Sequence, residues 1–204
     1  VSTYLFNITN HLSEDCVTNR QRLLDGKHAK DFTEITAKFD PPELTADTLV
    51  IDGLFGSGLN KPLAGGFASL VKYINQSPAK IVSIDVPSGL MSEDNTYNVR
   101  ANIIHATLTL TLHERKLSFL FADAQQFIGR LKVLDIRLSQ EFIQKTEAQF
   151  YVLEESDIRS RLIHRDDFAH KGDMGNALII AGSYGMSGAA ILSARACLRC
   201  GVGK

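Results

Sequence analysis

Two apolar runs of the sequence end in the same way, on an aspartate that precedes a turn rich in glycine, proline or serine. The stretch LVIDGLFGSGLNKPL carries Asp52 at the end of its apolar run, and IVSIDVPSGL carries Asp85 in the equivalent position. In open parallel α/β sheets, ligands bind beyond the carboxyl ends of the strands, near a switch in strand order. Both carboxylates are therefore candidates for contact with a ligand. We expect them to lie at the carboxyl ends of adjacent parallel strands and to open into one cleft.

The turn after Asp52 contains Gly56, Ser57 and Gly58. Glycine has no Cβ and tolerates positive φ, so the backbone could approach a ligand closely and point its N–H groups at a phosphate. The stretch fits neither a Walker A loop, because it lacks the Gly-Lys-Ser/Thr ending, nor the dinucleotide G-x-G-x-x-G pattern. Aspartate and glycine are also ordinary turn residues, and a turn is the simpler explanation of either site alone. Two such sites together make ligand binding an equally good explanation.

The residues around these turns predict a strand, a helix and a second strand. DTLVID and AKIVSID are continuous apolar runs, typical of parallel strands buried on both faces. Between them, Phe67, Leu70, Val71 and Ile74 recur at the spacing of one helix face. A βαβ unit with a right-handed crossover is expected from this order. The predicted fold class is therefore α/β.

Other segments extend this pattern, and the sequence changes in character near residue 145. We predict strands in VSTYLFNI, EITAKF, IIHATLTLTL and RLKVLDI, and a helix in SEDCVTNRQRLLDG that Ser13 can cap. The stretch SQEFIQKTEAQFYVLEESDI is polar and has no sheet period, so we place a domain boundary between residues 145 and 146. Beyond it, NALIIAGS predicts another buried strand and GAAILSARACLRCG a helix.

Two segments carry a resemblance to a known family. VIDGLFGSGLNKPLAGGFASLVKYIN followed by IVSIDVPSGL resembles the epimerase domain of the bifunctional NAD(P)H-hydrate repair enzymes, and ANIIHATLTLT and GRLKVLDI are similar to its later strands. HKGDMGNALIIAGSYGMSGAAILSARACLRCGVGK resembles the opening of the dehydratase domain of the same enzymes. The resemblance implies a Rossmann-like, three-layer αβα epimerase domain with a parallel sheet over residues 1–145. The beginning of a ribokinase-like α/β domain would follow over residues 146–204.

The family acts on NADH and NADPH that have taken up water across a ring double bond. Its members interconvert the R and S epimers of the hydrate and then dehydrate the S form with ADP or ATP. The resemblance therefore implies NAD(P)H-hydrate as the substrate, a potassium ion in the epimerase site, and ADP or ATP in the dehydratase domain.

Roles are implied for particular residues where the motifs match. Asp52 and Ser88 would be potassium ligands, since a hard cation prefers oxygen. Asp85 would contact the altered nicotinamide ring and act as the acid/base catalyst. Gly188 and Ala189 would approach the substrate of the dehydratase domain. Seven consecutive residues would line the hydrated dinucleotide: Gly56, Ser57, Gly58, Leu59, Asn60, Lys61 and Pro62.

The sequence departs from the family in one respect. The epimerases carry an Asn-Asn-Gly-Gly-Asp loop that binds substrate and supplies an asparagine to the potassium site, and nothing in residues 1–39 matches it. We expect the sequence to be a segment truncated at both ends and inactive by itself. Lys116, in the stretch HERK, matches a lysine of the family pattern without an assigned role, and we expect HERK to be a solvated loop.

Composition narrows the range of partners. The 22 Lys and Arg residues are balanced by 23 Asp and Glu residues, for a net charge of −1, so no basic surface for nucleic acid is expected. No apolar run approaches the ~18 residues that span a bilayer. Three cysteines suit a reducing compartment, and we expect a cytoplasmic protein. The expected partner is a small-molecule dinucleotide, and a homo-oligomer stays open.

Two other functions stay open at this point. A non-catalytic binding module with the epimerase fold is favoured by the missing loop, and the residues upstream of Val1 would discriminate it from an enzyme. A sugar-kinase-like phosphotransferase is suggested by the second segment alone, but residues 49–90 have no place in such a protein. Ala190, Ala194, Cys197 and Gly201 recur on one face of the predicted helix, which suits close packing. We therefore predict that Cys197 and Cys200, although spaced as C-x-x-C, are structural and bind no metal.

Overall fold

The structure is a computed structural model that describes residues 1–8, 10–26, 31–162 and 164–204. Its contacts divide the chain into two compact units, Val1–Thr146 and Glu147–Lys204, and each unit is described by itself. The division lies one residue from the boundary that the sequence predicts at 145/146.

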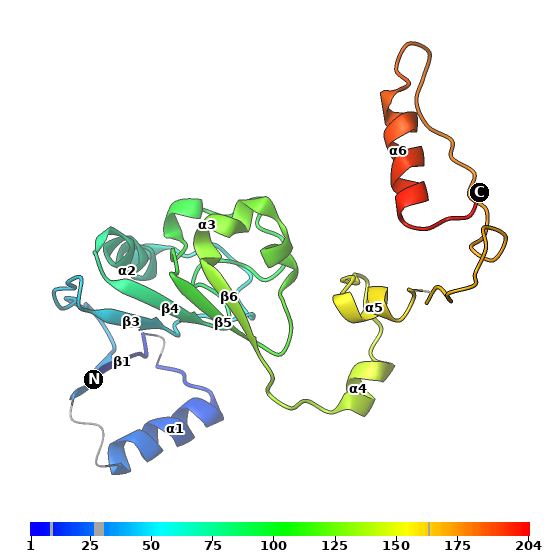
Figure 1. Cartoon of the computed structure of the whole chain (residues 1–204). Helices are drawn as coiled ribbons and strands as arrows, with labels where there is room; N and C mark the ends of the chain where they lie inside the picture. The colour runs from blue at the N-terminus through cyan, green and yellow to red at the C-terminus, as the bar shows by residue number, and fades with distance from the viewer. Residues whose placement is uncertain (9, 27–30, 163) are drawn as a thin grey trace. The chain divides into compact units, whose positions relative to one another are not determined.

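A four-stranded parallel sheet forms the centre of the first unit (Figure 1). Its strands are β3 (Leu49–Asp52), β4 (Lys80–Ile84), β5 (Leu108–Leu112) and β6 (Arg130–Leu134), and they lie in the order β3-β4-β5-β6. Every neighbouring pair is parallel. Each strand falls within a segment that the sequence predicts, and the α/β fold class is confirmed.

Helix α2 (Gly65–Gln76) connects β3 to β4 and packs on one face of this sheet. Val71 and Ile74 are buried against Ile81 of β4, and Phe67 and Leu70 pack at the margin of the same cluster. The four residues at helical spacing therefore form the packed side of the helix, as the sequence predicts. Burying a side chain of this size contributes about 1.5–3 kcal/mol.

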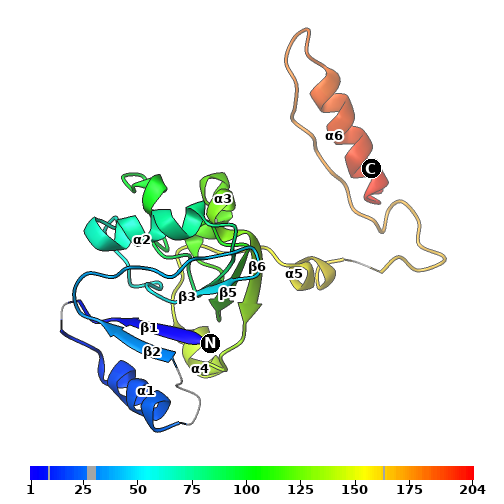
Figure 2. The same ribbon diagram turned by 90° about the vertical axis from the view of Figure 1, so that its left-hand side faces the viewer.

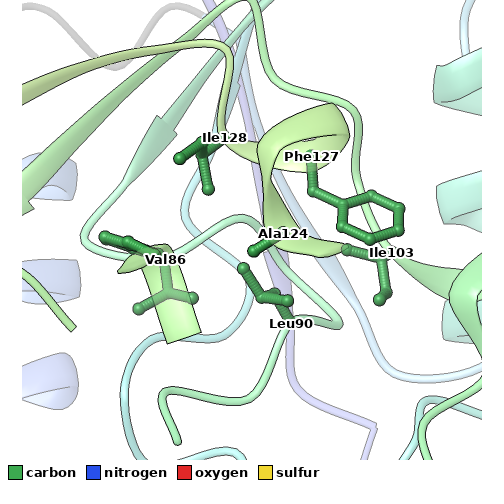
Figure 3. Close-up of a cluster of buried hydrophobic side chains, with 7 residues drawn as sticks. Val86, Leu90, Ile103, Ala124, Phe127 and Ile128 are labelled. Carbon is green, nitrogen blue, oxygen red and sulfur yellow. The ribbon is translucent and has the colours of Figure 1, made fainter. Parts of the chain in front are cut away.

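A second apolar cluster covers the same face of the sheet near β5 and β6 (Figure 3). It joins Val86 and Leu90, which follow β4, to Phe127 and Ile128 of α3 (Gln125–Ile128). Three 3-10 turns build the connections around it, η1 (Arg100–Asn102), η2 (Leu117–Leu120) and η3 (Ala122–Ala124). Helices α2 and α3 lie on the same side of the sheet in both ribbon views (Figures 1 and 2).

The opposite face of the sheet is less covered by the described residues. Leu49 and Ile51, which point there from β3, are each 58% exposed. The residues that alternate with them face α2, because successive side chains of a strand point to opposite faces. The second helical layer of the expected three-layer arrangement is not seen over this part of the sheet among the described residues.

The first 40 residues form a separate two-stranded parallel sheet with one helix. β1 (Ser2–Phe6) pairs with β2 (Asp31–Ile35), and α1 (Glu14–Asp25) lies between them in the chain. Ser13 caps α1 by accepting a hydrogen bond from the Cys16 N–H (3.3 Å), as predicted. The strand expected over EITAKF is displaced, because the strand ends at Ile35 and Phe39 packs from a loop against the Phe6 ring.

The second unit contains α5 (Glu155–Arg159) and α6 (Gly188–Arg199), and α4 (Gln140–Lys145) ends the first unit. The strand predicted over NALIIAGS is wrong for this structure, since the described residues show no ladder there. Leu178 and Ile180 are 87% and 90% exposed. An apolar run cannot form a strand without a neighbour to take its backbone hydrogen bonds. The ribokinase-like fold of this part stays a prediction.

Helix α6 presents its small residues on its least exposed side. Ala190, Ala194 and Cys197 are its half-buried positions, and the three cysteines of the chain are free thiols. Among the described residues, no helix combines the length and the apolar character that a membrane crossing requires.

Candidate functional site

The two aspartates lie at the carboxyl ends of adjacent parallel strands. Asp52 is the last residue of β3, Asp85 directly follows Ile84 at the end of β4, and Asp52 pairs with Ser83 in the ladder. This part of the sequence prediction is confirmed. The adjacency follows from the short crossover through α2, which returns the chain to the neighbouring position in the sheet.

Asp52 is a buried carboxylate, 2% exposed, that accepts hydrogen bonds from two other segments. Its Oδ2 accepts from the Ser83 hydroxyl (2.7 Å) and from the Ser88 N–H (2.9 Å). Its Oδ1 accepts from the Ser88 hydroxyl (2.5 Å). Among the described residues, no cationic side chain pairs with it. A buried charge is costly unless it is paired or hydrogen-bonded, and here hydrogen bonds alone offset that cost.

Three oxygen atoms of different chemical types lie close together at Ser88. The Ser88 hydroxyl lies 2.5 Å from Asp52 Oδ1 and 3.4 Å from the carbonyl oxygen of Phe55. A carboxylate, a hydroxyl and a backbone carbonyl are the ligand types that a hard cation prefers. In the described part of the chain, no group of three or more His, Cys, Asp or Glu side chains is arranged to hold a metal.

Asp85 has a strained backbone as well as a crowded side chain. Its φ is +67°, which is uncommon for a residue with a side chain, and the Val86 N–H donates to the Ile84 carbonyl (2.9 Å) around it. This is a γ-turn of the rare, strained kind. Backbone strain of this sort costs about 1–3 kcal/mol and clusters at functional sites.

Both carboxylate oxygens of Asp85 are held, but unequally. Oδ1 lies 2.9 Å from Lys116 Nζ, accepts from the Leu112 N–H (3.2 Å) and lies 3.5 Å from the Thr111 hydroxyl. Oδ2 accepts one hydrogen bond, from the Ser57 N–H (3.2 Å). Oδ2 therefore keeps more free acceptor capacity than Oδ1, and it faces the Gly56–Ser57 turn.

The environment of Asp85 favours its ionised form. Burial raises the pKa of Asp85, but the hydrogen bond from Lys116, the Leu112 and Ser57 N–H groups and the positive charge of Lys116 together hold that pKa below its usual range. Hydrogen bonds and an opposite charge stabilise a carboxylate more than burial penalises it here. Asp85 is therefore an anion at neutral pH.

The expectation that Gly56 and Gly58 allow a positive φ is not confirmed, and Gly56 is needed instead for its close contact with Asp85. Gly56 and Gly58 have ordinary negative-φ backbones, so positive φ is not the reason for these glycines. A Cβ on Gly56 would lie 3.3 Å from Asp85 Oδ2, a tight contact that glycine avoids. The Leu59 N–H donates to the Gly56 carbonyl (3.3 Å) and closes the turn.

Residues 56–62 present a largely exposed strip beside Asp85. Ser57, Gly58, Asn60, Lys61 and Pro62 are exposed, and Gly56 and Leu59 are half-buried. The structure thus brings this strip and Asp85 together through the Ser57 hydrogen bond. Gly188 and Ala189, at the start of α6, are exposed and belong to the second unit.

The expected common opening of the two carboxylates is not found. Asp52 is closed over by Ser88, whereas the Asp85 side chain is 13% exposed and contacts the 56–57 turn. The reason is that the chain after β4 folds back over Asp52 with Ser88. The two side chains therefore form neighbouring but separate centres.

Two side chains of these centres were not predicted as site residues from the sequence. Ser83 was hidden in an apolar run, where one polar residue in IVSID was the available signal. Lys116 was assigned to a solvated loop, but its side chain is only 17% exposed and pairs with Asp85. The solvated-loop prediction for HERK fails at His113, whose side chain is 19% exposed, and at Lys116, and it holds for Glu114 and Arg115, which are exposed.

The fold and the strand-end residues define an α/β protein whose candidate site lies at the carboxyl edge of a parallel sheet. Comparison with known families agrees with the α/β class and identifies a particular family within it. The profile described as YjeF-related protein N-terminus matches residues 1–118, and the chain belongs to this family.

Individual relatives are bifunctional enzymes by name. The chain is 36% identical over 162 residues to the bifunctional NAD(P)H-hydrate repair enzyme Nnr of Vibrio cholerae. The aligned residues make up 79% of this chain and 32% of the Vibrio cholerae protein. It is 34% identical over 155 residues to the Moorella thermoacetica protein of the same name (76% and 29%). It is 32% identical over 168 residues to the bifunctional NAD(P)H-hydrate repair enzyme of Leishmania major (80% and 30%). The chain spans about a third of the length of these relatives.

Proposed function

We propose that the intact protein repairs hydrated NADH and NADPH, and that residues 1–145 belong to the part that interconverts the R and S epimers. The names of the relatives support the substrate class. The observation that carries the proposal to this chain is Asp85, an anionic carboxylate held in a strained turn beside an exposed glycine strip.

Asp85 suits the chemistry that epimerisation requires. Inverting a carbon that bears a hydroxyl needs reversible bond-breaking and the transfer of one proton. Asp85 would take up that proton as the bond breaks and return it as the bond re-forms on the other face of the carbon, so it is unchanged after each turnover. Its rigid attachment at a strand end keeps Oδ2 in one place relative to the strip that would bind the dinucleotide.

The strip from Gly56 to Pro62 would hold the hydrated dinucleotide. Ser57, Asn60 and Lys61 are exposed polar residues on it, and Lys61 carries a positive charge suited to a phosphate. Gly58 leaves open space, since a Cβ at this position would meet nothing within 4 Å. A planar or phosphate-bearing ligand could therefore approach the backbone there.

Asp52 and Ser88 would hold a potassium ion, with the Phe55 carbonyl as a further oxygen donor. When bound, the ion supplies positive charge at the strand ends, which favours an anionic ligand. The Ser88 hydroxyl donates to Asp52 and accepts from the Phe55 N–H (3.0 Å), so one of its two lone pairs would remain for the ion.

Residues 146–204, which include the second unit, would begin the dehydratase part. Gly188 and Ala189 would approach its substrate, with ADP or ATP bound by residues beyond Lys204. The free thiols suit the reducing conditions of the cytoplasm, which we propose as the location.

The test is a direct assay of the two activities on one preparation of the intact protein. The R and S forms of NADH-hydrate are separated by chromatography, and R-to-S conversion is followed without nucleotide while S dehydration is followed with ADP or ATP. We expect conversion well above the spontaneous rate. An intact protein that binds the hydrate without accelerating conversion would be a binding module, and a protein that phosphorylates a sugar instead would be a kinase.

A further inference from the structure

The loop after β5 brings a buried cation to Asp85, and neither the proposed function nor the sequence motifs give that cation a role. Lys116 is separated from Asp85 by 31 positions in the chain, yet its Nζ lies 2.9 Å from Asp85 Oδ1. The two side chains are only 17% and 13% exposed. An ion pair this sheltered from water is much less screened than one on the surface.

The backbone of this loop is bent in the same strained way as at Asp85. His113 has φ +65°, and the Glu114 N–H donates to the Leu112 carbonyl (2.8 Å) around it. Neighbouring strands β4 and β5 therefore both end in a γ-turn of the rare kind, with Asp85 and His113 at the centres. Such strain persists only where the surrounding contacts over-determine the conformation.

Those contacts converge on Lys116. Its ammonium donates to the carbonyls of Leu112 (3.0 Å) and Glu114 (3.3 Å) in addition to its pairing with Asp85. Three oxygen partners use the three N–H donors of a lysine. The side chain thus ties the turn at the end of β5 to the turn at the end of β4.

The pairing with Lys116 also makes the two carboxylate oxygens of Asp85 unequal in their contacts. Lys116 and the Leu112 N–H occupy Oδ1, whereas among the described residues Oδ2 accepts a hydrogen bond only from the Ser57 N–H and faces the glycine strip. A carboxylate anchored through one oxygen presents the other in a fixed direction. Misplacement of a reacting group by about 1 Å can cost about 10²-fold in rate.

We propose that Lys116 is the positioning residue of the site: it anchors Asp85 through Oδ1 and thereby directs Oδ2 toward the substrate strip as the proton-transferring oxygen. The proposal rests on the proposed epimerase function for its kinetic consequence, although the anchoring itself does not depend on it. A loop lysine that served only to hold its own turn would need the Leu112 and Glu114 carbonyls but not the carboxylate.

The test compares Lys116→Met with Lys116→Arg in the intact protein, with Lys72→Met as the matched control. Lys72 is an exposed lysine on α2. We expect Lys116→Met to lower kcat for R-to-S conversion by about 10²-fold with little change in KM, because positioning acts on the transition state. Lys116→Arg keeps a charge and several donors, so its kcat should lie clearly above that of Lys116→Met. Lys72→Met should behave as the parent protein.

A second measurement follows the ionisation of Asp85 itself. The carboxyl carbon of Asp85 is titrated by ¹³C NMR and assigned by its loss in Asp85→Asn. Burial remains in Lys116→Met while the ammonium is gone, so the pKa of Asp85 should rise, and the acidic limb of the pH–rate profile should move to higher pH. His113 and Glu114 are ionisable neighbours on the same loop, with 3.8 Å between His113 Nε2 and Glu114 Oε1, and the assigned NMR signal distinguishes Asp85 from them.

Several outcomes would overturn the inference. One is a Lys116→Met protein with the parent kcat and an unchanged Asp85 titration. Another is a lowered kcat without any change in the Asp85 titration and without recovery by arginine, which would show a purely structural loop contact. If Lys116→Met does not fold, Lys116→Gln takes its place, since glutamine keeps a donor without the charge. If the parent protein shows no conversion at all, the proposed function fails, and the Asp85 titration still decides whether Lys116 anchors the carboxylate.

Discussion

Asp52 and Asp85 are the same residue type at equivalent places in neighbouring strands, but their surroundings give them different capacities. Asp52 is enclosed by the hydroxyls of Ser83 and Ser88, and this environment favours a structural or ion-binding role for its carboxylate. Asp85 has a cation on one oxygen and a less occupied oxygen that faces an exposed strip. Environment rather than residue type therefore separates the ligand candidate from the acid/base candidate.

Asp85→Asn tests the acid/base role with little change of shape. The amide can still contact the ring, but it cannot carry the proton, so we expect kcat for R-to-S conversion to fall by about 10²-fold or more. Substrate binding should change much less. Asp47→Asn, at an exposed aspartate just before β3, is the matched control and should be neutral. R-to-S conversion close to the parental rate would leave Asp85 as a strand-end cap.

Substitution of Asp52 tests the ion site. Removing the carboxylate in Asp52→Ala takes away a hard oxygen ligand, so we expect weaker conversion and a changed dependence of the rate on potassium concentration. The same change leaves the Ser83 and Ser88 donors unsatisfied at a cost of about 1–3 kcal/mol each. Asp52→Asn is therefore measured in parallel, because its amide oxygen keeps an acceptor. A potassium response identical to that of the parent in both variants would make Asp52 a turn residue.

At the scale of the elements, the turn after β4 depends on a glycine that no other residue can replace. Gly89 has φ +97°, and a Cβ there would lie 2.2 Å from the Asn102 carbonyl oxygen and 2.9 Å from the Ile103 Cα. This close approach lets the turn pack on η1 and positions Ser88 over Asp52. A strand-end centre thus relies on the packing of a turn that lies outside the sheet.

Gly89→Ala should consequently destabilise the protein by about 3 kcal/mol or more, since it adds backbone strain to a steric clash. The change is measured as a lowered urea midpoint in equilibrium unfolding. Gly66→Ala is the control, because this helical glycine has open space around it and an ordinary backbone. It should alter the free energy of unfolding by less than about 1 kcal/mol. Equal effects of the two substitutions would refute the packing argument.

At the scale of the whole molecule, the chain consists of two units joined by an exposed segment. Residues 147–154 contain no helix or strand among the described residues, and Phe150, Tyr151 and Leu153 are 64%, 86% and 70% exposed. Exposed, irregular segments are the preferred sites of proteolysis. The segment that follows the division between Thr146 and Glu147 is therefore expected to be accessible to a protease.

Brief chymotrypsin treatment of the native protein should therefore cut within residues 150–153, as it should at Phe168 and Tyr184, which are 99% and 106% exposed. The buried Phe119 and Phe127 of the first unit should resist cleavage under the same conditions. The fragments are identified by mass spectrometry, and a Phe150→Ser, Tyr151→Ser, Leu153→Ser variant should slow the cut within residues 150–153. An initial cut between β5 and β6 would show that the first unit is less compact than the structure indicates.

The elements of the four-stranded sheet, helix α2 and the placement of both aspartates could be predicted from the sequence. Continuous apolar runs marked β3 and β4, the helical spacing of Val71 and Ile74 marked α2, and a short crossover requires neighbouring parallel strands. These features depend on residues close together in the chain. They could therefore be predicted from the spacing of the apolar residues and from the turn residues that end each run.

The hydrogen-bond and charge partners of the two carboxylates could be known only from the tertiary structure. The partners of Asp85 come from Ser57, Leu112 and Lys116, and the cover over Asp52 comes from Ser88, which lies 36 positions away in the chain. Nothing in a local pattern shows that a loop lysine turns inward, or that an apolar run such as NALIIAGS lacks a strand beside it. Both depend on which distant segments supply hydrogen-bond partners, because a charge or a backbone group is stable in the interior only when such a partner is present.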